Sequence, residues 1–111
     1  MSKGLRTLSQ AVALFRDLDP NVPAATVLAF LHVAAAEGGD MRMRDLQDAL
    51  GVASSSASRN VAFLSERHSL GKAGLDLVEN YVDLLDPRYK RVRLKPKGRT
   101  LKARLDQLME R

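Results

Sequence analysis

Residues 45–67 read DLQDALGVASSSASRNVAFLSER, and this stretch decides the fold. It predicts a short helix ending at Leu50, a turn at Gly51 and a second helix over about 54–67, because glycine adopts the left-handed backbone that ends a helix at little cost. Apolar residues recur in the second helix at spacings of i, i+4 and i+7, which predicts a buried stripe of Ala57, Val61 and Leu64. Two such helices joined by a tight turn form a helix-turn-helix, here over about 44–67.

The second helix also carries a cluster of polar residues near its start: Ser54, Ser55, Ser56, Ser58, Arg59 and Asn60. Small side chains let a helix backbone approach a DNA groove closely, and the first N–H groups of a helix can meet a phosphate. Arg59 can pair with guanine or a phosphate, and Asn60 can pair with adenine if its side chain points outward. The alternative interpretation is that the serines cap the helix and Arg59 is a solvated surface residue.

A change of hydrophobic period follows this unit. Residues 75–82 and 91–95 alternate with the period of 2 that is typical of strands. They flank Asp86-Pro87-Arg88, so the sequence predicts an antiparallel hairpin, or wing, over about 75–95. Arg88 lies at a proline-stiffened tip and can project from it, although an arginine at a loop tip can also be simply solvated.

Three more helices are expected, over about 7–17, from Pro23 to just before Gly38-Gly39, and over about 96–111. The middle one is almost wholly apolar, which predicts that it is the central buried helix. A short extended piece is expected at 41–43. The chain therefore predicts one mainly α-helical domain over 1–111: a three-helix core, a two- to three-stranded antiparallel sheet that includes the wing, and a C-terminal helix.

The charge of the chain favours a polyanionic partner. Its formal net charge is +5, and residues 51–111 hold thirteen basic against seven acidic side chains. Nine basic residues and no acidic one lie between Arg88 and Arg104. A one-sided positive field concentrates polyanions such as nucleic acid. Lys90, Arg91, Arg93, Lys95 and Lys97 are expected to add attraction for phosphates.

Other classes of protein find little support in the sequence. There is no Cys, which excludes disulfides and thiolate metal sites, and two isolated histidines do not make a metal site. No catalytic triad or carboxylate pair is evident, so we expect no catalytic residue, no enzyme activity and no cofactor. We also expect no membrane span and no signal peptide, and hence a cytoplasmic location.

The spacing Asp-x-Arg-x-x-x-Val-x-Leu-x-x-x-Gly in residues 86–98 resembles the wing signature of the multiple-antibiotic-resistance regulator (MarR) family of bacterial winged-helix transcription factors. Residues 45–52, followed by Ser56-Ala57-Ser58-Arg59, resemble the helix-turn-helix of the same family. The two motifs occur in the same order as in the family, and together they cover about residues 41–101.

This resemblance implies a winged helix-turn-helix fold and a function in transcriptional regulation by binding double-stranded DNA, in a bacterium, phage or plasmid. It places residues 54–60 in the major groove and Arg88, held by Asp86, in the minor groove. It also implies a homodimer. Departures from the family pattern are Ala53 and Lys95, where capping hydroxyls are usual, and terminal helices shorter than those that build the family's dimer. The alternative function is that of a winged-helix protein–protein adaptor, such as an antirepressor or a component of a replication complex.

Overall fold

The computed structural model describes residues 1–66 and 71–110. In chain order the elements are α1 (Lys3–Leu18), α2 (Ala24–Ala35), a 3₁₀ turn (Glu37–Gly39), β1 (Asp40–Arg42), α3 (Met43–Leu50), α4 (Ser54–Leu64), β2 (Val78–Val82), β3 (Lys90–Leu94) and α5 (Pro96–Met109). The strands form one antiparallel sheet in the order β1-β3-β2. The expected mainly α-helical winged helix is therefore confirmed. The short extended piece expected at 41–43 corresponds to strand β1, which pairs with β3.

Two helices have bounds that differ from the expected ones, for local reasons. Helix α1 begins four residues early because the Ser2 hydroxyl accepts a hydrogen bond of 3.2 Å from the N–H of Leu5 and caps it. Helix α4 ends at Leu64 instead of about residue 67, because the backbone becomes extended at Ser65. The hydroxyl of Ser65 donates to the Val61 carbonyl at 2.7 Å, which satisfies one of the last carbonyls of the helix. The segment 67–70 lies outside the described residues.

The hairpin strand before the tip begins at Val78, later than the alternation predicts. The backbone N–H groups of Leu75 and Leu77 donate to carbonyls at the end of α4, at 3.0 and 2.8 Å. Between them Asp76 has a φ of 57°, so the chain cannot run straight there. As a result Leu77 and Val78 are both buried, whereas a strict alternation would bury only one of them.

The core surrounds one side of α2. Phe30 and Val33 are fully buried, and the ring of Phe30 meets that of Phe15 from α1 edge-on at a centroid distance of 5.6 Å. Helix α2 is not buried all round, however, because Leu28 and Leu31 are 47% and 41% exposed. The other fully buried large apolar side chains come from α3, α4, the strands and the segment that leads into β2: Leu46, Val61, Leu64, Leu77, Val78 and Val92. The expected buried stripe of Ala57, Val61 and Leu64 on α4 is confirmed.

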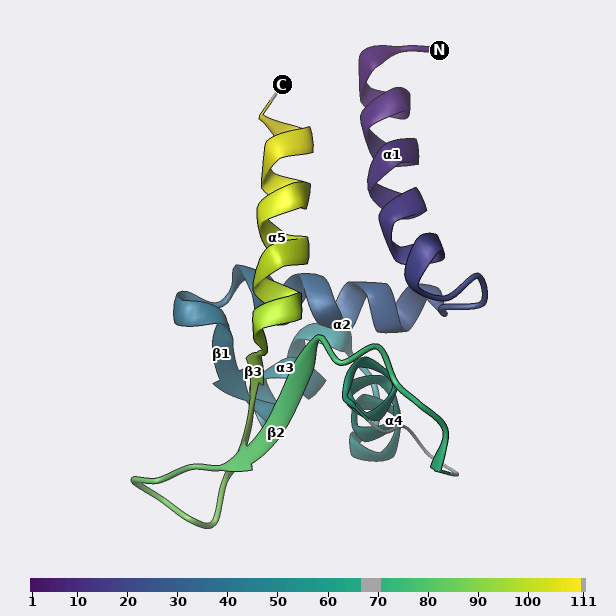
Figure 1. Cartoon of the computed structure of the whole chain (residues 1–111). Coiled ribbons are helices and arrows are strands. Elements are labelled where there is room, and N and C mark those ends of the chain that lie inside the picture. Colours follow the sequence, from purple (N-terminus) through teal and green to yellow (C-terminus); the bar gives the residue numbers. More distant parts are fainter. Residues whose placement is uncertain (67–70, 111) are drawn as a thin grey trace.

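The molecule has two different ends. Helices α1 and α5 stand on one side of α2 and carry both chain termini (Figure 1). Helices α3 and α4 and the β2–β3 hairpin lie toward the opposite end, and the hairpin tip projects from the body (Figure 1). In the part of the chain that the structure describes, no helix is long and apolar enough to cross a membrane.

Candidate nucleic-acid interface

The turn between α3 and α4 sets the position of the serine-rich helix. Gly51 has a φ of 66° and a ψ of 34°, and its N–H donates to the Gln47 carbonyl at 3.0 Å. This left-handed C-cap ends α3 and turns the chain into α4, as the sequence predicts. Helix α4 starts after Ala53, which has no hydroxyl, and among residues 1–66 and 71–110 no side chain caps its N-terminus. The first N–H groups of α4 thus have no side-chain cap.

Most of the polar residues expected at the interface are accessible on α4. Ser54, Ser55, Ser58 and Arg59 are exposed, and Ser56 is half-buried. Arg59 donates to the Ser56 hydroxyl at 3.1 Å, so its guanidinium lies along the first turns of the helix. This contact is exposed and can exchange for a base or a phosphate at little cost.

Asn60 differs from its neighbours in α4. Its Oδ1 accepts a hydrogen bond of 2.9 Å from the hydroxyl of Thr26 on α2. Thr26 is 1% exposed and Asn60 is half-buried. The condition set for adenine pairing, an outward side chain, is therefore not met, and Asn60 instead joins α4 to the central helix.

The hairpin tip carries the expected pair of Asp86 and Arg88. The Arg88 Nε and Nη2 donate to the two carboxylate oxygens of Asp86 at 3.0 and 2.8 Å, and the Arg88 side chain is 82% exposed. The hydrogen bonds from Arg88 lower the pKa of the Asp86 carboxyl below its ordinary value. A two-point contact of this kind restricts the arginine to one orientation while leaving the outer face of its guanidinium in solvent.

The ring of Tyr89 contacts two arginine side chains near the same tip. The guanidinium of Arg42, from β1, lies 4.4 Å from the centroid of the Tyr89 ring, and that of Arg88 lies 5.7 Å from it. These cation–π contacts tie the tip to the edge of the sheet. Tyr89 thus packs on the hairpin.

Three of the basic residues expected to attract phosphates are paired with acids of the same domain. Arg91 lies 3.0 Å from Asp40, Arg93 lies 2.8 Å from Glu79, and Lys95 lies 2.6 Å from Asp76. The hydrogen bonds that Arg91 donates to Tyr81 and Asp40 raise its pKa, and those that Arg93 and Lys95 donate to their carboxylate partners raise the pKa of these two residues. Five basic residues were expected to attract phosphates. The three that are paired with carboxylates should attract phosphates less strongly than unpaired cations do.

Lys90 and Arg44 are better placed to meet phosphates. Lys90 is exposed at the start of β3, beside the tip, and forms no ion pair with the residues that the structure describes. Arg44, which the sequence analysis did not single out, is exposed on α3 and lines a groove with Ser54 and Ser58. Arg44 lies beside these serines because α3 packs against α4. No sequence motif could therefore have identified it.

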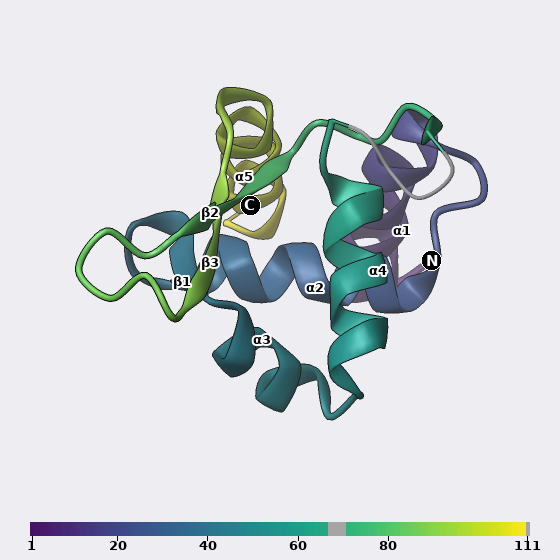
Figure 2. The same ribbon diagram turned by 90° about the horizontal axis from the view of Figure 1, so that it is seen from below.

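The helix and the tip share one face of the molecule. Seen from below, α4 faces the viewer and the hairpin extends beside it, while α1 and α5 lie behind (Figure 2). Helix α4 and the hairpin tip therefore lie at the same end of the domain (Figure 1).

Several solved structures have a similar fold. The chain is similar to the S. aureus MepR–DNA complex, with a TM-score of 0.65, 18% identity, and coverage of 97% of this chain and 73% of that one. It is also similar to AbsC, a MarR family transcriptional regulator from Streptomyces coelicolor, with a TM-score of 0.65, 20% identity, and coverage of 94% and 69%. The chain has a MarR-like winged-helix fold.

A third similar structure is RV1404 from Mycobacterium tuberculosis, with a TM-score of 0.68, 16% identity, and coverage of 95% of this chain and 65% of that one. No family model and no curated protein sequence matches the chain. At these identities the likeness shows the MarR-like fold alone, and each neighbour extends beyond the part matched here.

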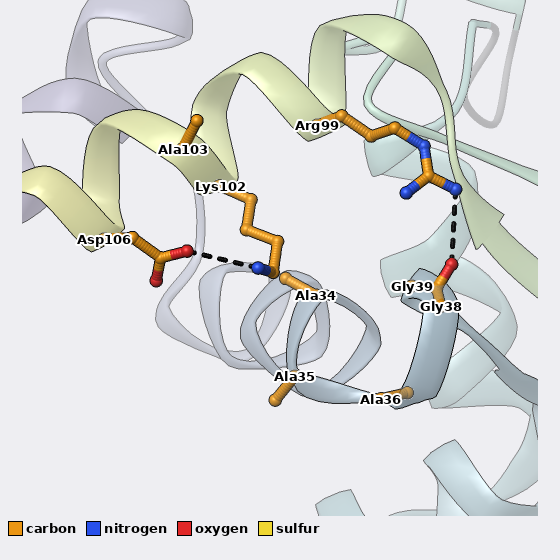
Figure 3. Close-up of a pocket in the computed structure, with 9 residues that line it drawn as sticks. All are labelled: Ala34, Ala35, Ala36, Gly38, Gly39, Arg99, Lys102, Ala103 and Asp106. Carbon is orange, nitrogen blue, oxygen red and sulfur yellow. Dashed lines mark hydrogen bonds and ion pairs between the residues drawn. The ribbon is translucent and has the colours of Figure 1, made fainter.

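A pocket away from the proposed interface lies between the end of α2 and α5. It is lined by small residues at the end of α2 and by charged residues of α5 (Figure 3). Arg99 donates to the Gly38 carbonyl at 3.2 Å, and Lys102 pairs with Asp106 at 3.1 Å. Among the described residues no group of three or more metal-ligating side chains gathers.

Proposed function

We propose that this MarR-like domain binds double-stranded DNA in a sequence-dependent manner and acts as a transcriptional regulator without catalysis. One observation carries the proposal: helix α4, whose first residues include exposed serines, and the tip of the β2–β3 hairpin lie at the same end of the domain (Figure 1). A DNA complex is known for the similar structure of MepR. The fold, the face and the basic charge all support the same function.

The dimensions of α4 fit the major groove. Its 11 residues make a helix about 16 Å long, and the groove is ~12 Å wide. Ser54, Ser55 and Ser58 are short, so they let the backbone approach the base edges, while Arg59 reaches a guanine or a phosphate. Arg88 enters the neighbouring minor groove, where narrow A·T-rich stretches attract arginine. Lys90 and Arg44 contact phosphates on either side.

We further propose that two copies assemble through the end of the molecule opposite this face. An apolar groove of about 390 Å³ lies among α1, α2 and α5, and its lining includes exposed side chains of Leu8, Val12 and Met109. Burying this surface against a second copy stabilises a dimer through the hydrophobic effect. The two α4 helices then read half-sites of an inverted repeat with centres about 34 Å apart.

Selection of bound duplexes from a random pool tests the proposal. The expected result is an enriched inverted repeat that the protein binds in gel shifts far more tightly than a scrambled duplex of equal length. Footprinting then shows whether one or two copies occupy the site. A pool that enriches no sequence, together with a salt-insensitive complex with a protein partner, would instead identify the domain as an adaptor.

A further inference from the structure

The most exposed apolar side chains of the hairpin lie at its tip. Leu84 and Leu85 are 90% and 97% exposed, directly before the Asp86-Pro87-Arg88 turn. Contact of two adjacent leucines with water is unfavourable, and a surface that keeps such side chains in a projecting position is typical of a contact site. The DNA contacts proposed for α4 and for Arg88 do not explain why these two leucines are exposed.

The backbone that carries these leucines is held in place from both sides. Asp83 is 8% exposed, and its Oδ1 accepts from the N–H groups of Leu85 and Asp86 at 2.9 and 3.3 Å. The other oxygen of Asp83 lies 3.5 Å from Arg91 Nη1. The N–H of Asp83 donates to the Tyr89 carbonyl at 2.9 Å, which closes the base of the loop. An ordered loop loses little conformational freedom when its tip enters a partner.

We propose that Leu84 and Leu85 form an apolar wedge that enters the minor groove and partly unstacks a base step, so that the protein kinks the DNA it binds. This inference rests on the proposed function and assigns a second task to the same tip. Apolar side chains that enter the minor groove between base steps kink duplexes by about 20–90°. The minor groove is only ~6 Å wide, which suits a projecting hairpin tip better than a broad surface.

Position and charge select DNA as the partner. Arg88 and Lys90 follow the leucines within five residues, so the tip joins apolar and cationic groups in the way a groove lined by phosphates requires. The tip lies at the same end of the domain as α4 (Figure 1), so with α4 in the major groove we expect the tip to meet the adjacent minor groove. The wedge should favour pyrimidine–purine steps such as TA and CA, because these unstack most easily.

The test compares two double variants on one duplex from the selected pool. The duplex carries a fluorescence donor and acceptor at its ends and 2-aminopurine at the pyrimidine–purine step nearest the tip. Leu84→Ser with Leu85→Ser removes the apolar surface, whereas Leu84→Met with Leu85→Met retains it. Because both side chains are almost fully exposed, neither variant should lower the thermal unfolding midpoint, and Leu84→Ser alone replaces the double variant if it does.

We expect the wild-type protein and the Met variant to shorten the end-to-end distance and brighten the 2-aminopurine. The Ser variant should leave the duplex nearly straight and bind it about tenfold more weakly, with an unchanged salt dependence because no charge is removed. An unkinked duplex with the wild-type protein, or an equal kink with the Ser variant, would overturn the wedge alone. A wild-type protein that binds no duplex would overturn both the wedge and the proposed function.

Discussion

The hydroxyl of Thr26 donates a hydrogen bond of 2.9 Å to Oδ1 of Asn60, and this contact joins the central helix to the helix that carries the serines. Thr26 is 1% exposed, so its hydroxyl has left water and needs a partner inside the protein. The pair therefore fixes where α4 lies on α2. Asn60 therefore holds the helix that carries the proposed DNA-binding surface in position from within the protein.

Replacing Asn60 by Ala should lower the free energy of unfolding by about 1–3 kcal/mol, because the Thr26 hydroxyl loses its acceptor. Urea unfolding measures this loss. Ser58→Ala is the matched control, since Ser58 is exposed two positions away and its removal should change stability by less than about 0.5 kcal/mol. Unchanged stability of Asn60→Ala, combined with altered base preference, would return Asn60 to direct readout.

The features that the sequence predicts well depend on near neighbours in the chain. Gly51 and the apolar stripe of α4 are visible within about twenty residues, so the helix-turn-helix could be located. The start of β2 could not, because it depends on hydrogen bonds from Leu75 and Leu77 to the end of α4. Likewise, the pairing of Arg93 with Glu79 follows from the strand register, in which these two residues face each other. Side-chain direction at Asn60 is another property that only packing decides.

Arg59 and Arg88 should each contribute to specific binding from a different groove. We expect Arg59→Ala and Arg88→Ala to weaken binding to the selected duplex by about 1–3 kcal/mol each. Gel-shift titrations at fixed salt measure the loss, and circular dichroism should show an unchanged fold. Arg6→Ala is the control, because Arg6 is an exposed cation on α1, away from the proposed face. Equal affinity of all three variants for the duplex would contradict the assigned interface.

Ion pairs within the sheet should decide which basic residues contribute to the salt dependence of DNA affinity. If Arg44, Arg59 and Lys90 each neutralise one phosphate, the slope of log K against log salt is about −2.7 per chain. Lys90→Ala should make the slope shallower by about 0.9, whereas Arg93→Ala should leave it nearly unchanged because Glu79 already neutralises Arg93. Affinity measured at several salt concentrations gives both slopes. Equal changes for the two variants would show that the Arg93 ion pair opens on DNA.

The carboxylate of Asp83 should make the hairpin tip sensitive to acid. The hydrogen bond from the Leu85 N–H lowers the pKa of Asp83 below its ordinary 3.8, with help from the Asp86 N–H and Arg91 and against the effect of burial. Its contribution to stability is therefore complete above pH 3.8 and is lost as the pH falls through the folded-state pKa. The amide NMR signals of Leu85 and Asp86 should titrate with a midpoint below 3.8, and Asp83→Asn should abolish this titration. A midpoint above that value would mean that the loop is not held by Asp83.

Two helical glycines should respond in opposite ways to the same change. A Cβ on Gly98, in the first turn of α5, would lie 2.1 Å from the Leu77 carbonyl oxygen, which also accepts the Lys95 N–H. Backbone must move to admit it, so Gly98→Ala should cost about 1–3 kcal/mol in unfolding free energy despite alanine's higher helix propensity. A Cβ on Gly4 in α1 meets nothing within 4 Å, so Gly4→Ala should be neutral or stabilise the protein by up to about 1 kcal/mol. Urea unfolding of both variants compares them directly. A stabilised Gly98→Ala would show that α5 does not pack this tightly against the chain entering β2.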